Sequence, residues 1–179
     1  MALREIIVAP DPRLKVKAKP VIRVDARIRR LMDDMLETMY AAPGIGLAAP
    51  QVGEALQVIV LDVAKDDQPK QPLRLANPEI VWASEERIPH EEGCLSLPEQ
   101  FADVTRPRAV RVRYRDHDDV VRELEASGLL AVCVQHEMDH LEGLLFVDHI
   151  STLRRSMILK RLVKYKKAKA AEKDERIGT

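Results

Sequence analysis

Residues 129–141 read LLAVCVQHEMDHL, and the pattern H-E-x-x-H occupies positions 136–140 of this run. The run is largely apolar and Gly143 follows it closely, which predicts a helix that ends before this glycine. Residues four apart on a helix share one face and lie about 6 Å apart along its axis. The imidazoles of His136 and His140 can therefore converge on one cation.

Glu137 follows the first histidine of the pattern directly. On a helix it would lean beside the ion, where a carboxylate can accept a proton from activated water. The alternative is a helix with exposed charges and two core histidines. The apolar character of the rest of the helix, in a chain with five histidines, favours the metal site.

The third metal ligand decides which class of metalloprotein this is, because several classes share H-E-x-x-H. The longer pattern H-E-x-x-H-x-x-G-x-x-H holds as far as Gly143, but its last position is Phe146. A downstream glutamate would have to be Glu142, which is too close to the motif, or Glu172 or Glu175 in a charged tail. These alternatives are unfavourable.

The chain has two cysteines. Cys133 precedes His140 by seven residues, about 10 Å along a helix, so it cannot share an ion with both histidines and is predicted to be a buried thiol. Cys94 lies in the segment EGCLS at 92–96, which we expect to be a loop in which Gly93 lets the backbone approach another element. Cys94 could complete a Cys/His/His site with one open position, although a single cysteine is more often a core residue.

The segment GIGLAAPQ at 44–51 satisfies G-x-G-x-x-A, the pattern of dinucleotide-binding turns. That pattern requires a strand before it and a helix after it, whereas here the predicted order is reversed. The small residues around Ile45 and Gly46 would let an extended ligand approach the backbone. The Gln51 amide could donate a hydrogen bond to a developing oxyanion, but a packed turn with a surface glutamine explains this loop equally well.

The remaining segments predict the rest of the fold. Helical periodicity begins after Asp25 and runs to Met39, and a second helix begins at Ser151 and continues towards residue 171. Residues 56–63 predict a buried strand, residues 110–125 a hairpin, and residues 9–20, with three prolines, an irregular loop. This order predicts an α+β fold with antiparallel or mixed β-sheets around a central metal-binding helix, and a C-terminal helix.

The composition is that of an ordinary globular chain: 179 residues, 46% hydrophobic and 32% charged, with a net charge of zero. The charges are, however, unevenly distributed along the chain. Ten basic and three acidic residues lie between Arg154 and Arg176, so this tail carries a net charge of about +7. We expect a catalytic domain at 1–150 and a basic helix at 151–179 that belongs to the same domain. The chain as a whole offers no field that would attract nucleic acid.

The longest uncharged stretch, Thr38–Gly53, has 16 residues and is broken by prolines and glycines. It is too short to span a membrane, and the N-terminal residues do not form the apolar region of a signal peptide. We therefore expect a cytoplasmic protein without a membrane partner.

The segments at 44–51, 92–96 and 135–140 together resemble the three motifs of peptide deformylases of the bacterial type, in the same order. The resemblance implies a hydrolase that removes the N-formyl group from the N-terminal formylmethionine of nascent polypeptides and releases formate. It implies one divalent ion, Fe²⁺ first and Ni²⁺, Co²⁺ or Zn²⁺ as alternatives. It assigns Cys94, His136 and His140 as ligands, Glu137 as general acid/base, and Gln51 with the Leu95 backbone N–H as the oxyanion site.

Further residues are expected to contact the substrate or orient the ligands. Leu129, Val132 and Cys133 precede His136 by one and two turns and could line an apolar slot for the methionine side chain. Ile45, Gly46 and Gly93 are expected beside the peptide backbone. Glu92, with Arg106 as its partner, is a candidate to orient a ligand, the alternative being a surface ion pair.

Two positions depart from the bacterial pattern. Phe101 stands where many members have arginine, and His90 replaces an apolar residue at the rim of the pocket. At these two positions the resemblance therefore predicts no particular contact with the substrate peptide. Two other functions compete: a metallopeptidase that cleaves internal peptide bonds, and a ribosome-binding module with a purely structural metal. The basic tail could dock on ribosomal RNA without sequence specificity, or be only a solvated helix face.

Overall fold

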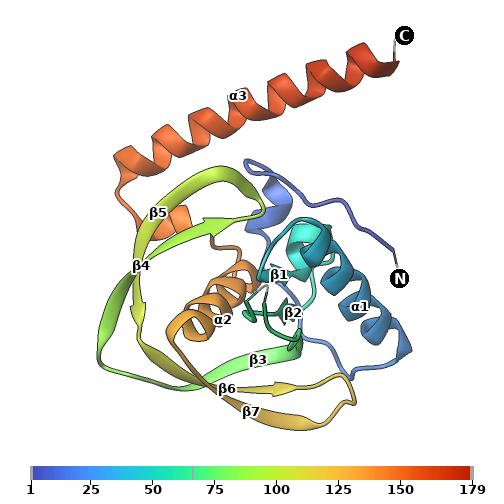
Figure 1. The fold of residues 1–179 in the computed structure, drawn as a ribbon, viewed down its shortest axis with the longest axis vertical. Helices are drawn as coiled ribbons and strands as arrows, with labels where there is room; N and C mark the ends of the chain where they lie inside the picture. The colour runs from blue at the N-terminus through green and yellow to red at the C-terminus, as the bar shows by residue number, and fades with distance from the viewer. Residues whose placement is uncertain (1, 66, 178–179) are drawn as a thin grey trace.

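The computed structural model describes residues 2–65 and 67–177, so residues 1 and 66 of the expected domain 1–150 and residues 178 and 179 of the expected tail lie outside the described part. Within that part the structure has three α-helices and seven strands (Figure 1). The helices are α1 (Ala26–Ala41), α2 (Gly128–Leu141) and α3 (Thr152–Ile177). The strands are β1 (Gly46–Ala48), β2 (Val58–Leu61), β3 (Leu73–Ala83), β4 (Arg87–Cys94), β5 (Leu97–Pro107), β6 (Ala109–Arg115) and β7 (Val121–Ser127).

The strands form a five-stranded sheet in the order β1-β2-β3-β6-β7 and a two-stranded sheet of β4 and β5, both antiparallel. Helix α2 occupies the centre of the fold, with the two sheets curving around it, and α1 packs on β1 and β2 (Figure 1). The predicted α+β architecture, with a central helix bearing H-E-x-x-H and a C-terminal helix, is confirmed.

Helix α2 is surrounded on almost every side. Its apolar residues Ala131 and Val134 join the β2 and β6 residues Ile59 and Val112 in one core cluster. Its polar residues are buried as well: Gln135, His136, Glu137 and His140. A helix that buries polar groups must find partners for them, because each unpaired buried polar group costs about 1–3 kcal/mol.

The other predicted elements agree with the structure except at some boundaries. Helix α1 begins after Asp25, whose side chain accepts a hydrogen bond from the Ile28 N–H at 3.0 Å. Strands β6 and β7 form the predicted hairpin. The strand expected at 56–63 is shorter, because Leu56 makes an isolated bridge with Lys19 and the Asp62 side chain accepts a hydrogen bond from the Ala64 N–H. The proline-rich loop contains a 3₁₀ turn, η1 (Pro12–Lys15).

The expectation that residues 92–96 form a loop is wrong. Glu92, Gly93 and Cys94 end strand β4, and only the turn that follows them is irregular. Strand β4 has no apolar alternation because one of its inward positions is Glu92, whose carboxylate accepts hydrogen bonds from the Arg106 side chain of β5. A buried ion pair therefore hides the period-2 pattern by which strands are recognised. Strands β1, β3 and β5 also formed no part of the prediction.

The N-terminal segment ties the two glycine-containing motifs together. The Ile7 N–H donates to the Gln51 carbonyl and the Ala9 N–H to the Ser96 carbonyl, each at 2.8 Å. Helix α3 then crosses this side of the molecule and buries Ile158 and Leu162 in the cluster that contains Phe146 (Figure 1). Among the described residues, no helix combines the length and apolar character that a membrane span requires.

Gly143 follows the C-terminal end of α2, and its backbone conformation predicts how a substitution there changes the free energy of unfolding. Its φ is +74°, and a Cβ there would lie 2.5 Å from the Lys15 carbonyl oxygen; Gly128 has φ +58° and nothing within 4 Å of such a Cβ. Gly128→Ala carries only the left-handed strain and is expected to lower the free energy of unfolding by about 1 kcal/mol, whereas Gly143→Ala adds a clash and should cost at least about 2–3 kcal/mol. Equilibrium urea unfolding measures both. Equal losses would contradict this packing.

Candidate metal centre

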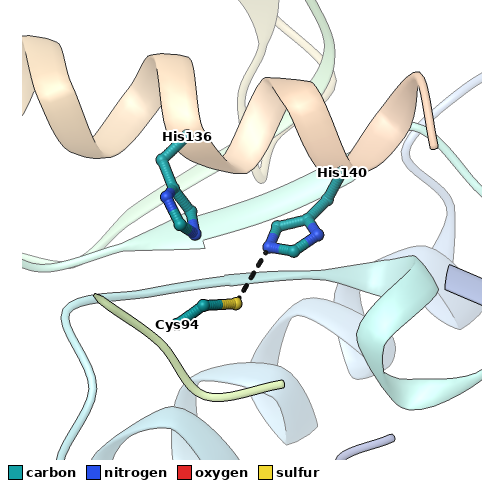
Figure 2. A group of neighbouring side chains, drawn as sticks. All are labelled: Cys94, His136 and His140. Atoms are coloured by element: carbon teal, nitrogen blue, oxygen red, sulfur yellow. Dashed lines mark hydrogen bonds between the residues drawn. The ribbon is translucent and has the colours of Figure 1, made fainter. Parts of the chain in front are cut away.

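Three side chains from two elements converge at the centre of the fold. Cys94 ends β4, and His136 and His140 lie one turn apart on α2; their ligand atoms all lie within 4.8 Å of one another. The Cys94 Sγ is 3.4 Å from the His140 Nε2 (Figure 2). Sulfur and nitrogen ligands of one tetrahedral ion lie about 3.6 Å apart. Cys94, His136 and His140 lie close enough together to hold one metal ion. This agrees with the spacing of the two motifs that contain them.

Glu137, which follows His136 directly on α2, is buried as well. Among the residues that the structure describes, no protein atom pairs with its Oε2. Burial raises the pKa of Glu137 to about 7, and the charge of His136 acts in the opposite direction. Gly46 makes the approach possible, because a Cβ there would collide with the Glu137 carboxylate and the Cys133 sulfur. An orphaned buried carboxylate beside a soft/borderline donor set fits a metal centre with room for water or substrate.

His136 is oriented by a buried ion pair. The His136 Nδ1–H donates to the Glu92 Oε2 at 2.9 Å, which leaves Nε2 for a metal. The Arg106 guanidinium donates hydrogen bonds to both carboxylate oxygens of Glu92. The Arg106 side chain is 6% exposed and that of Glu92 2%, so the alternative of a surface ion pair is ruled out. Burial acts to raise the pKa of Glu92, but hydrogen bonds from Arg106 and His136 outweigh it and lower this pKa to about 2.

Gln51 is buried, so the alternative of a surface glutamine is wrong. Its Oε1 accepts from the Ala48 N–H at 2.8 Å, and its Nε2 donates to the Ser96 Oγ at 3.0 Å and lies 3.5 Å from the Cys94 Sγ. The amide orientation is therefore fixed, with the donor side towards the metal ligands. Ser96 formed no part of the prediction, although it lies in the quoted EGCLS segment.

The expected substrate-side residues fall into two groups. Cys133 and Val132 are buried on α2, and the Cys133 Sγ lies 3.4 Å from the Ile45 carbonyl oxygen. Burial raises the pKa of Cys133, as expected of a buried thiol outside the ligand set. Leu129 and Ile45 are exposed at 43% and 42%.

On the β4–β5 sheet, the Phe101 ring covers Gly93, where it leaves no room for a Cβ. Phe101 is itself 59% exposed. His90 is half-buried and its Nδ1 lies 2.8 Å from the Glu91 carbonyl oxygen. Leu95 lies in the turn after Cys94, and its side chain leaves no room for a Cβ at Gly44. An exposed aromatic ring thus stands beside the strand that ends in Cys94.

Comparison with known proteins places this arrangement. Residues 3–156 match the family of polypeptide deformylases. The chain belongs to this family. A peptide deformylase of Methylocella silvestris is 59% identical over 175 residues, which cover 96% of this chain and 89% of the relative, and one of Phenylobacterium zucineum is 55% identical over 168 residues, covering 94% and 99%.

Solved structures agree. The crystal structure of a peptide deformylase from Ehrlichia chaffeensis superposes with a TM-score of 0.90 at 36% identity, covering 94% of this chain and 99% of that one. A peptide deformylase from Legionella pneumophila gives a TM-score of 0.88 at 43% identity, covering 94% and 98%. The resemblance inferred from the three motifs is therefore confirmed at the level of family and fold.

Arg106 near the end of β5, and Arg108 just after this strand, provide a matched test of the buried ion pair. Arg106→Leu leaves Glu92 buried without its counter-charge and should lower the free energy of unfolding by about 3–5 kcal/mol. The ion pair of Arg108 with Glu86 is 59% exposed on both sides, so Arg108→Leu should cost less than about 1 kcal/mol. Urea unfolding of chelator-treated protein compares them without a contribution from metal binding. Similar losses in the two variants would refute the structural importance assigned to Arg106.

Proposed function

We propose that this protein is a metal-dependent peptide deformylase, which hydrolyses the N-formyl group from the formylmethionine of nascent polypeptides and releases formate. The observation that carries the proposal is the convergence of Cys94, His136 and His140 beside the unpaired Glu137 carboxylate. Relatives more than 50% identical are named peptide deformylase, and a solved deformylase of Ehrlichia chaffeensis is a complex with actinonin. The metal we expect is Fe²⁺, and the donor set also accepts Ni²⁺, Co²⁺ or Zn²⁺.

In the proposed reaction, a bound ion would polarise the formyl group and lower the pKa of water. Glu137 takes a proton from the attacking water and later returns it to the amine that leaves. The Gln51 Nε2–H and the Leu95 backbone N–H donate to the oxyanion of the tetrahedral intermediate. The hydrogen bond from the Ala48 N–H supports this role, because it holds the Gln51 amide with its donors facing Cys94. Glu92 and Arg106 orient His136.

The substrate backbone is proposed to extend the edge of β1. This strand is at the end of the five-stranded sheet, so among the residues that the structure describes its outer side has no partner strand. The Asp62 N–H donates to the Ile45 carbonyl and Leu47 faces Val60, so the alternation of an antiparallel pair turns the Gly46 N–H and C=O to the open edge. An extended peptide could pair there and pass Gly93 on its other side.

The small acyl group and the methionine side chain are proposed to enter different spaces. A formyl carbon carries only hydrogen, so a small pocket at the metal can accept it and reject larger acyl groups by shape. Val132 and Cys133 would line the methionine slot, with the more exposed Leu129 at its entrance.

We assign the catalytic domain to residues 1–150, with 151–179 a basic helix of the same domain, and place the enzyme in the cytoplasm.

Replacing the proposed general acid/base gives the direct test. Purified protein, loaded anaerobically with Fe²⁺ or Ni²⁺, should release formate from formyl-Met-Ala-Ser. Glu137→Gln should lower kcat by about 10²–10⁴-fold, the range of general acid–base catalysis, while the protein keeps its metal, which metal analysis after gel filtration checks.

Two outcomes would contradict the proposal. The first is no formate from the fully loaded wild-type protein. The second is cleavage of internal bonds in unformylated peptides by both the wild type and Cys94→Ala, which would favour a metallopeptidase instead. Unchanged activity in Glu137→Gln would exclude the assigned role of this carboxylate.

A second function, docking on ribosomal RNA, is favoured by the surface of α3. The helix anchors itself through Ile158 and Leu162, whereas its basic residues Lys160, Lys164 and Lys167 are exposed. We propose that they contact RNA phosphates near emerging chains, without sequence specificity. Such binding depends on counterion release and is therefore sensitive to salt.

Neutralising these lysines tests the docking. The variant Lys160→Gln/Lys164→Gln/Lys167→Gln should lower the slope of log affinity for ribosomes against log salt by about two to three, while formate release from free peptides is unchanged. A control variant removes three exposed arginines from the body of the protein, Arg23, Arg27 and Arg30. Ribosome sedimentation over a range of salt concentrations measures the slopes. Salt-insensitive binding, or an equal effect of the control, would leave α3 a solvated helix.

A further inference from the structure

The 3₁₀ turn after α2, η3 (Phe146–His149), contacts side chains of α2 at both of its ends. At its start, the buried Phe146 ring stacks on His136 with ring centroids 6.4 Å apart and an angle of 27°. At its end, the His149 Nε2–H donates to the Asp139 Oδ2 at 2.7 Å. The His149 side chain is 35% exposed and lies outside the proposed ligand set.

Asp139 connects His149 to the buried ion pair. The same Asp139 oxygen accepts a hydrogen bond from the Arg106 Nη1 at 2.9 Å. The Arg106 Nη2 donates to the Glu92 Oε2 at 2.9 Å, and this oxygen also accepts from the His136 Nδ1. An unbroken series of hydrogen bonds therefore runs from a half-exposed histidine to a proposed metal ligand.

We infer that His149 is a positioning residue for His136, acting through Asp139, Arg106 and Glu92. This inference rests on the proposed metal centre. The Arg106 guanidinium is planar and rigid, so its two contacts with Glu92 and its contact with Asp139 fix one orientation together. The Asp139 side chain is 21% exposed and needs its second donor, His149, to stay in that orientation against competition from water.

The role of His149 can be separated from the folding of η3. This turn is held by Asp148, which accepts from the Leu145 N–H at 2.8 Å and pairs with Lys15 and Arg155. Phe146 anchors it in the core. Removal of the His149 imidazole therefore leaves η3 in place and takes away one donor from Asp139.

The test follows the loss of metal, which needs no substrate. Protein loaded with Co²⁺ is mixed with excess chelator, and the decay of the thiolate-to-cobalt absorption gives the rate of metal loss. His149→Phe keeps a ring but loses the donor, and should accelerate the loss about three- to tenfold, less than the 10–100-fold effect of removing a direct partner of a ligand. His149→Gln keeps an N–H donor and should restore a rate close to that of the wild type.

Two controls make the result specific. His117 lies in the β6–β7 turn beside Asp33 and Asp118, half-exposed like His149, and His117→Phe should leave the rate unchanged. In an Asp139→Asn background, His149→Phe should have a much smaller effect, because the two act in series.

The inference is overturned if His149→Phe loses cobalt at the wild-type rate. It is also overturned if His149→Gln is as fast as His149→Phe, since packing alone would then account for the effect. If the wild-type protein forms no thiolate-to-cobalt absorption, the proposed metal centre is wrong and this inference falls with it. Metal retention by the wild type thus separates the two failures.

Discussion

The buried hydrogen bonds among Glu92, Arg106 and His136 are the interaction on which the rest of the structure depends. A central helix that carries two histidines and a glutamate would be costly if its polar face were buried against apolar strands alone. The β4–β5 sheet offsets this cost, because it brings the Glu92 carboxylate and its counter-charge, Arg106, into the same interior. It therefore has to curve around α2, and by doing so it delivers Cys94 to the two imidazoles.

The same arrangement leaves selected groups without protein partners. Within the described part of the chain, the Glu137 Oε2 and the His140 Nδ1 are buried and lack one. Of two neighbouring residues of one helix, His136 therefore has a protein partner that orients it, whereas Glu137 keeps an unpaired carboxylate oxygen. This difference is the one that the proposed function requires between a metal ligand and a general acid/base.

Glycines and small residues let other elements come close enough to complete the site. Gly46 brings the edge of the large sheet against Glu137 and Cys133, and Gly93 lies under Phe101. The N-terminal segment then hydrogen-bonds to the backbone of both motif segments. The proposed substrate groove is thus lined by backbone at glycine positions, where no side chain covers it.

The sequence predicted what depends on local pattern or on the spacing of motifs. The cap at Asp25, the apolar spacing of α1, the β6–β7 hairpin and α2 with its histidines are all local signals, and the three motifs predicted the family and the convergence of Cys94, His136 and His140. The strand character of Cys94 was not predicted, because Glu92 and Arg106 occupy inward positions where a strand pattern requires apolar residues. The burial of Gln51 and the contacts of Ser96, Asp139 and His149 depend on pairings between distant segments, which have no local signature.

The metal coordination itself tests the central claim most directly, and X-ray absorption at the edge of zinc or cobalt in the loaded protein measures it. The account predicts one sulfur at about 2.3 Å and two imidazole nitrogens at about 2.0–2.1 Å, with the sulfur lost in Cys94→Ser and retained in Cys133→Ser. A shell without sulfur, or a sulfur that disappears in Cys133→Ser instead, would contradict it.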